Sequence, residues 1–111
     1  MTFDKWSLNL VNIMNREGVK IIAGTDTPIG YLTPGFSLHK ELELLSEAGM
    51  TNKEVLHSAT IAPAEFLNIQ NEIGTIEEGK LADLIILNQN PLESIKNTQD
   101  IYLVIAKGIV Q

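Results

Sequence analysis

The alternation of apolar and polar residues predicts an amphipathic helix followed at once by a buried strand. We expect the helix over residues 4–17, because one face repeats apolar residues at helical spacing, namely Trp6, Leu10, Ile13 and Met14. Asp4 can cap its first turn, and Gly18 is expected to end it. Residues 19–23 are apolar apart from one lysine, which is typical of strands in parallel sheets.

Three further helices are predicted after a loop over residues 24–35 that is rich in glycine, proline and threonine. A helix over 37–48 would bury one apolar stripe in the core, formed by Leu38, Leu42 and Leu45. Thr51 and Glu54 have the spacing of a capping box for a helix over 51–60. Pro63 is expected to begin a short helix over 64–67, since proline is tolerated in the first turn.

After residue 71 the pattern changes to short extended segments. We expect these segments over residues 74–76, 84–87 and 101–106, with a helical turn over 92–98. Lys107 and Gly108 would form the tight turn of a hairpin whose return arm is 109–110. The chain therefore reads as α/β in two parts, with residues 1–70 mostly helical and residues 71–111 mostly β.

Length and charge restrict the class of protein and of partner. A chain of 111 residues fits one small domain or a piece of a larger one. Its net charge of -6 argues against nucleic acid or an anionic membrane surface as a partner, and no apolar run approaches the roughly 20 residues of a membrane span. The sequence has no cysteine and its first residues lack the features of a signal peptide, so we expect a cytoplasmic protein.

Asp26 is the candidate catalytic residue that the chain offers most directly. It follows the predicted strand and stands between two threonines. In barrels and open α/β sheets, ligands bind at the carboxyl ends of the strands. The alternative is a turn residue, because an aspartate before Thr-Pro readily bonds nearby backbone amides. From the residues alone, the turn is the simpler interpretation.

The two histidines and the acidic residues of the second predicted helix have structural alternatives. His39 could contact a substrate, or it could cap or pack near the start of its helix. His57 is interpreted as a solvated residue or one at the edge of the core. The charged series of the helix over 37–48 is interpreted as a solvated face, made of Lys40, Glu41, Glu43 and Glu47.

Lys80 and Asp83 are interpreted as structural residues of the β part. Gly79 would occupy a turn, and Asp83 would begin a strand and bond backbone amides.

An ordered series of short motifs runs along nearly the whole chain. In order these are GTD at 24–26, GxSxHxEL at 35–42, EAGMT at 47–51, ATxxPA at 59–64, GTIExGKLADL at 74–84 and NPL at 90–92. Each motif is weak by itself, and the segment over 74–84 is the most specific. The ordered series resembles the C-terminal part of metal-dependent amidohydrolases, in the imidazolonepropionase-like and prolidase-like branch.

This resemblance implies a (β/α)₈ barrel joined to a small composite β-sandwich. Residues 4–17 would be the seventh barrel helix, residues 19–23 the eighth strand, and residues 37–67 the closing helices. Residues 73–111 would be the C-terminal contribution to the sandwich. The expected fold class is therefore an α/β fragment of such a barrel, followed by a small β segment.

The resemblance also assigns a chemistry to Asp26. It matches an aspartate that binds a divalent metal, with zinc expected, and that shuttles protons. A metal lowers the pKa of bound water from about 16 to about 7, and a carboxylate can pass that proton to a departing amine. Small-molecule substrates are implied, with His39 and Thr27 as candidate contacts. The implied reaction is hydrolysis of a C–N bond in an amide, cyclic amide, amidine or non-classical peptide.

Most of the family's metal ligands are missing from this sequence. The family uses a His-x-His, a lysine or glutamate, and two further histidines, whereas this chain has two histidines in all and no His-x-His. A catalytic zinc takes three protein ligands, and a whole barrel needs roughly 250 residues. We therefore expect an enzyme in the parent protein and an inactive, metal-free chain in isolation. The alternative is a non-catalytic small domain that forms homo-oligomers, or assembles with another chain, through strand edges and apolar helix faces.

Overall fold

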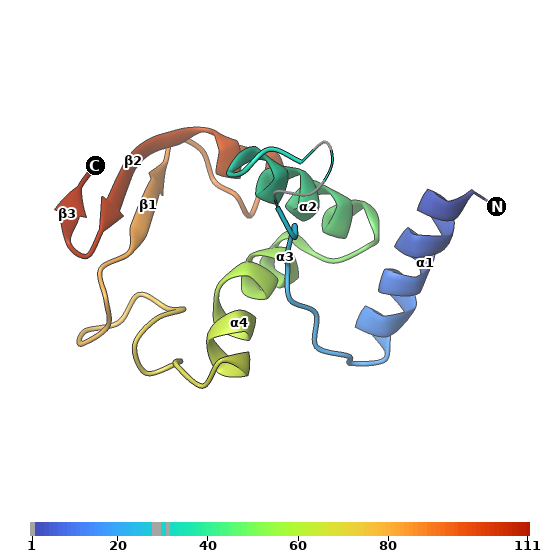
Figure 1. Ribbon diagram of the computed structural model, residues 1–111, viewed down its shortest axis with the longest axis horizontal. Coiled ribbons are helices and arrows are strands. Elements are labelled where there is room, and N and C mark those ends of the chain that lie inside the picture. Colours follow the sequence, from blue (N-terminus) through green and yellow to red (C-terminus); the bar gives the residue numbers. More distant parts are fainter. Residues whose placement is uncertain (1, 28–29, 31) are drawn as a thin grey trace.

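The computed structural model describes residues 2–27, 30 and 32–111 and contains four α-helices, one 3₁₀ helix and three strands in those residues (Figure 1). The helices are α1 (Phe3–Arg16), α2 (Phe36–Glu47), α3 (Asn52–Ala59) and α4 (Ile61–Phe66). They are followed by β1 (Leu84–Leu87), the 3₁₀ helix η1 (Ile95–Gln99), β2 (Ile101–Ala106) and β3 (Ile109–Val110). Figure 1 shows α1 at one end of the molecule, the sheet at the other, and α2 to α4 between them. No helix in the described residues is long and apolar enough to cross a membrane.

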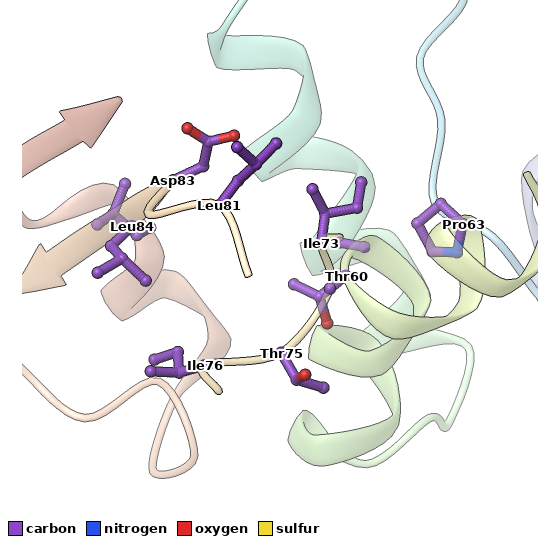
Figure 2. Close-up of a pocket in the computed structure, with 11 residues that line it drawn as sticks. Thr60, Pro63, Ile73, Thr75, Ile76, Leu81, Asp83 and Leu84 are labelled. Atoms are coloured by element: carbon purple, nitrogen blue, oxygen red, sulfur yellow. The ribbon is translucent and has the colours of Figure 1, made fainter. Parts of the chain in front are cut away.

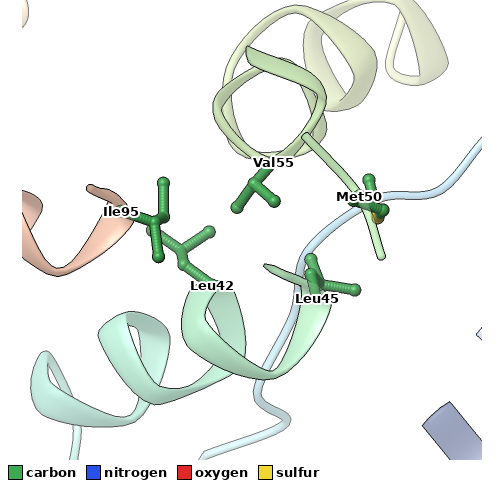
Figure 3. Packing of buried hydrophobic residues seen from close by; sticks show 5 residues of the cluster. All are labelled: Leu42, Leu45, Met50, Val55 and Ile95. Carbon is green, nitrogen blue, oxygen red and sulfur yellow. The ribbon is translucent and has the colours of Figure 1, made fainter. Parts of the chain in front are cut away.

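The core lies where α2, α3 and η1 meet. Five buried side chains form it, namely Leu42, Leu45, Met50, Val55 and Ile95. Figure 3 shows Val55 of α3 directed toward Leu42 and Leu45 of α2, with Ile95 beside Leu42. Val55 is completely buried, and the other four side chains are 4–6% exposed.

Local capping signals set the ends of the helices. The N-cap of α1 is Thr2, whose hydroxyl accepts from the Lys5 backbone N–H at 3.3 Å, so the prediction that Asp4 caps this helix is wrong. Asp4 lies in the first turn instead, where its charge favours the helix dipole. The capping box at Thr51 and Glu54 is confirmed, with both reciprocal hydrogen bonds present.

The C-terminal ends of α1 and α2 use the same glycine-based closure. After α2, Gly49 has a φ of 103°, its N–H donates to Ser46, and the Met50 N–H donates to Leu45. A Cβ at residue 49 would lie 2.4 Å from Nδ2 of Asn12, which donates to the Ala48 carbonyl at 2.7 Å. Glycine is therefore required at this position by the backbone and by the approach of α1.

Low pH is expected to weaken the N-terminal cap of α3, because it protonates the carboxylate of Glu54. The Thr51 backbone N–H and then the Asn15 side chain hold the pKa of Glu54 below its ordinary value of 4.5. A lowered folded-state pKa means that this stabilisation is present above the unfolded pKa and is lost as the pH falls through the folded value. Glu54→Gln should therefore flatten the pH dependence of the urea midpoint below about pH 4.5. Parallel pH curves for the variant and the parent chain would contradict the assignment.

The predicted strand over residues 19–23 is not a strand in the structure. These residues run as an irregular extended segment, coloured light blue in Figure 1, and no neighbouring strand pairs with them in the described part of the chain. The backbone N–H of Ala23, at the end of this segment, donates instead to the Ser58 carbonyl at 2.9 Å. An apolar segment forms a β-strand only when a second strand supplies the hydrogen bonds of the ladder. The apolar pattern of the segment carries no information on whether that second strand is present.

The predicted apolar face of α1 is only partly covered. Trp6 is 52% exposed and Ile13 is 46% exposed. The residues of α1 that meet the other helices lie on another side, and they include Val11, Asn12 and Asn15. In the second predicted stripe, Leu42 and Leu45 are buried as expected, whereas Leu38 is 40% exposed.

The C-terminal part forms a three-stranded antiparallel sheet in the order β1-β2-β3. The register of β1 on β2 shifts between Ile86 and Leu87. The helical turn expected over 92–98 is present as the 3₁₀ helix η1, which begins later, at Ile95, and ends at Gln99. Residues 74–76 form a bend and not an extended segment, because Gly74 has a φ of 102°. The short helix α4 begins at Ile61, three residues before the expected start.

Asp83 holds the hairpin turn between β2 and β3. Lys107 and Gly108 both have positive φ, as the predicted tight turn requires. The Lys107 N–H donates to Oδ1 of Asp83 at 2.8 Å, and the Gly108 N–H donates to the Ala82 carbonyl at 3.0 Å. The prediction that Asp83 bonds a backbone amide at the start of a strand is confirmed.

Asp83→Ala is expected to lower the free energy of unfolding by about 1 kcal/mol, because it removes this hydrogen bond at an exposed site. Asp83→Asn keeps an acceptor oxygen and should lose less than half of that amount. Urea denaturation of both variants measures the difference. An equal loss in both variants would show that the hydrogen bond is not what stabilises the turn.

Candidate functional site

Asp26 lies at the end of the extended segment, in a left-handed backbone conformation. Asp26 has a φ of 55° and is exposed to solvent. Aspartate tolerates this conformation better than most residues. The conformation is nevertheless uncommon in residues other than glycine, and it often occurs in functional loops. Thr25 and Thr27 flank it, and their hydroxyls lie 3.4 Å apart. The turn alternative would involve backbone amides after residue 27, and residues 28 and 29 lie outside the described residues.

The segment that leads to Asp26 is held by contacts with helices. The Val19 N–H donates to the Met14 carbonyl of α1 at 2.9 Å, and the Ala23 N–H donates to Ser58 of α3. Ile21 and Ala23 pack against the hydrophobic core cluster. The position of Asp26 is therefore set from the helical side, even though no strand pairs with the segment in the described residues.

His39 is hydrogen-bonded to Thr98 of η1. Its Nδ1 lies 3.0 Å from Oγ1 of Thr98, and that hydroxyl donates to the Ile95 carbonyl at 3.0 Å. Because the hydroxyl has a single proton, His39 must donate from Nδ1, and its Nε2 is then an acceptor in the neutral ring. The Gln99 side chain also donates to Glu43 at 2.7 Å. This face of α2 thus joins the helix to η1.

The structure places His39 and the Asp26 loop on different sides of α2. The Gly24 backbone N–H of the loop segment lies near enough to Glu41 to lower the pKa of its carboxyl group. Residues two apart on a helix point about 200° from one another, so His39 and Glu41 face nearly opposite directions. The structure therefore brings Thr25, Asp26 and Thr27 together in one loop, whereas the described contact of His39 is with η1.

Glu41 is a residue of this region that the sequence interpretation missed. It was expected on a solvated face, yet it is half-buried and burial raises its pKa, an effect that the Gly24 N–H partly offsets. Its helical spacing to Leu45 and Ala48, which are both buried, is the signal that could have indicated its position. His57 and Glu47 are exposed, in agreement with their predicted solvation.

The described residues do not form a complete metal centre. No group of three or more histidine, cysteine, aspartate or glutamate side chains lies close enough to hold a metal ion within the part of the chain that the structure describes. The carboxylate of Asp26 has the right donor chemistry for a divalent metal, but a catalytic zinc requires three protein ligands. Asp26 can therefore supply one ligand of such a centre and no more.

The most specific motif, over residues 74–84, forms a turn and lines a cavity of about 380 Å³. The cavity lies between the α4 region and the residues before β1 (Figure 2). Lys80 donates to Thr75 at 2.6 Å and pairs with Glu77 at 2.9 Å, which closes the turn that contains Gly79. A Cβ on Gly74 would lie 2.9 Å from Cβ of Ala64, so only glycine fits beside α4. These contacts give the motif a structural role.

Comparison with known proteins supports the sequence resemblance. A sequence model described as the amidohydrolase family matches residues 5–110. Imidazolonepropionase of Bdellovibrio bacteriovorus is 35% identical over 78 residues, which are 66% of this chain and 17% of that protein.

Two solved structures superpose closely on the chain. A Xaa-Pro dipeptidase with bound methionine in the active site has a TM-score of 0.84 and 34% identity, covering 94% of this chain and 25% of that one. A putative prolidase from Bifidobacterium longum has a TM-score of 0.84 and 38% identity, covering 91% of this chain and 25% of that one.

The chain thus spans about a quarter of the solved structures that it resembles, and less of the curated relatives. Nearly all of its own length takes part in the match, including the Asp26 loop and the motif around Gly74. The chain belongs to the amidohydrolase family.

Proposed function

We propose that this chain is the C-terminal part of a metal-dependent hydrolase of C–N bonds, and that Asp26 is its catalytic carboxylate. The observation that carries the proposal is the exposed, left-handed Asp26 at the end of an anchored extended segment. A carboxylate there would take a proton from an attacking water and deliver it to the departing nitrogen. Substrates of the amide, cyclic amide or amidine class suit this chemistry.

The proposal assigns the remaining machinery to residues outside this chain. Asp26 would be one ligand of a divalent metal, with zinc proposed, because a single carboxylate does not make a catalytic centre. The isolated chain is therefore expected to be inactive. Thr27 and His39 stay candidate substrate contacts, with Thr27 favoured by its place beside Asp26.

The arrangement of helices supports a place in a (β/α)₈ barrel. In this proposal α1 is the seventh barrel helix, residues 19–23 are the eighth strand, and α2 to α4 close the barrel. Residues 73–111 contribute to a composite β-sandwich. The extended segment is hydrogen-bonded to α1 and α3, and no strand among the described residues pairs with it. Other parts of a barrel would supply the pairing strands.

The surface area of the chain supports the same conclusion. Its accessible surface is 8125 Å², whereas a monomeric protein of this size exposes about 6,000 Å². The excess of about 2,000 Å² is more than the roughly 800 Å² that each partner buries in a standard interface. Large apolar side chains contribute to it at both ends of the molecule, for example Trp6, Tyr102 and Ile109, and Phe66 of α4 contributes between them. A surface of this extent is covered in a larger assembly.

A chimera tests the proposal. The matching quarter of the Bifidobacterium longum prolidase is replaced by this chain, and hydrolysis of a Xaa-Pro dipeptide is measured with added Zn²⁺. We expect hydrolysis by the chimera and none by the chain alone. A chimera that folds, by circular dichroism and gel filtration, yet neither binds zinc nor hydrolyses the dipeptide would contradict the proposal.

Self-association is the second candidate. The exposed apolar side chains and the open outer edge of β1 favour pairing with another copy. In that case the isolated chain would sediment as a dimer or larger species, and dilution would dissociate it. A monomer at high concentration would count against this candidate and leave the barrel proposal in place.

A further inference from the structure

The C-terminal end of α3 offers the Asp26 segment a carbonyl that the helix itself does not use. Ser58 lies in the last turn of α3, where backbone carbonyls have no partner four residues further along the same helix. Its carbonyl accepts from the Ala23 N–H at 2.9 Å. Within the described residues, this is the last backbone–backbone hydrogen bond between the segment and the helices before Asp26. The end of α3 therefore sets where the Asp26 loop begins.

Thr60 forms the break between α3 and α4 and is hydrogen-bonded to both helices. It has a φ of -129° and a ψ of -76°, outside helical geometry. Its N–H donates to the His57 carbonyl at 3.3 Å, and its hydroxyl donates to the Leu56 carbonyl at 2.8 Å. Its own carbonyl accepts from the Ala64 N–H of α4 at 3.4 Å. A displacement of Thr60 is therefore passed to the last turn of α3, which carries the Ser58 carbonyl.

Gly74 of the most specific motif lies directly against this break. A Cβ at residue 74 would lie 2.9 Å from Cβ of Ala64 and 3.3 Å from the carbonyl oxygen of Thr60. Neither neighbour can move by a side-chain rotation, since one atom is the Cβ of a buried alanine and the other belongs to the backbone. Gly79 of the same motif also has a positive φ, but nothing lies within 4 Å of a Cβ there. The close approach is thus specific to residue 74.

We infer that Gly74 is a positioning residue for Asp26. By letting its motif pack against the α3–α4 break, it keeps the Ser58 carbonyl where the Ala23 N–H reaches it. The inference rests on the proposed function of Asp26, which follows Ala23 by three residues, a stretch of at most about 11 Å when extended.

The size of the displacement makes this contact relevant to the Asp26 carboxylate. Carbon atoms pack best at about 3.5–4.0 Å, so a Cβ at residue 74 would have to move from Ala64 by roughly 0.6 Å. Catalytic groups must be held to within about 0.5 Å. A shift of that size at the break, passed on through the Ser58 carbonyl, therefore exceeds what a catalytic position tolerates.

The test is amide hydrogen exchange and ¹⁵N relaxation in the 111-residue chain. Gly74→Ala introduces the close contact, whereas Gly79→Ala adds a Cβ at a similar positive φ without one. We expect Gly74→Ala to speed exchange of the Ala23 amide about 10-fold or more relative to the Gly79→Ala control. It should also lower the order parameter of Asp26 below about 0.6. The Val55 amide, which is hydrogen-bonded at the other end of α3, should exchange equally in both variants.

Two further variants separate the contact from a general loss of stability. When Gly74→Ala is combined with Ala64→Gly, one side of the close contact is removed, and Ala23 protection should return to within a few-fold of the Ala64→Gly chain. Thr60→Val removes the hydroxyl that donates to Leu56 and should speed Ala23 exchange several-fold, whereas Thr60→Ser should not. Ala23 exchange in Thr60→Val that equals the exchange in the parent chain would contradict the inference, whether or not Gly74→Ala folds.

The inference is overturned if Ala23 exchange in Gly74→Ala matches the Gly79→Ala control, or if the double variant does not restore protection. Joint loss of protection at Ala23 and Val55 also overturns it, since that result shows general loosening of the helices. Because none of these measurements depends on hydrolysis, a failure here is distinct from a failure of the catalytic role of Asp26.

Discussion

Asp26→Asn in the prolidase chimera is expected to lower kcat for dipeptide hydrolysis by about 10³-fold or more. Asparagine has nearly the same shape, but it cannot accept a proton from water or deliver one to the leaving nitrogen. General acid–base groups contribute about 10²–10⁴-fold, and loss of a metal ligand would add to that. The measurement is steady-state kinetics with zinc content determined on the same samples.

Asp4→Asn is the matched control for this experiment. It makes the same chemical change at an exposed residue in the first turn of α1, far along the chain from the loop. We expect kcat within about twofold of the parent chimera, because surface substitutions of this kind have small effects. If Asp26→Asn also retained full kcat, Asp26 would be a turn residue, and the catalytic assignment would be wrong.

Leu42→Ala is expected to lower the free energy of unfolding of the isolated chain by about 3 kcal/mol. Leu42 is 4% exposed and contacts the buried cluster around Val55 and Ile95 (Figure 3). The substitution removes apolar contacts and leaves a cavity in a core cluster of five buried side chains. With a urea slope of about 1.5 kcal/mol per M, the midpoint should fall by about 2 M.

Leu38→Ala controls for the change from leucine to alanine on the same helix. Leu38 lies one turn before Leu42 and is 40% exposed, so we expect a loss below about 1 kcal/mol. Equal midpoints for the two variants would mean that the core does not lie between α2, α3 and η1. A difference of 2 kcal/mol or more would support the arrangement in Figure 3.

Signals that act over a few residues were predicted well. The capping box at Thr51 and Glu54 is present, and the turn at Lys107 and Gly108 joins the β2–β3 hairpin. These features depend on hydrogen bonds and dihedral angles that the residues themselves favour, so the sequence contains the information directly.

Signals that needed a distant partner were predicted poorly. Residues 19–23 have the composition of a strand but lack a pairing strand in the described structure, and the apolar face of α1 remains largely exposed. The contact of His39 is with Thr98, 59 residues further along the chain, and Glu41 lines a cavity with Leu8 and Val11 of α1. Neither partner follows from local spacing, because helix rotation and packing decide which side chains meet.

The sequence by itself determined the family, the capping box of α3, the turn at Lys107 and Gly108, and Asp26 as the candidate carboxylate. Only the tertiary structure decided which apolar positions are buried, that the Asp26 segment is held from its helical side, and that His39 and Glu41 face different elements. The physical reason is the separation along the chain over which each kind of interaction acts. Backbone propensities and capping act within about four residues, whereas burial and side-chain pairing depend on surfaces brought together from far apart in the chain.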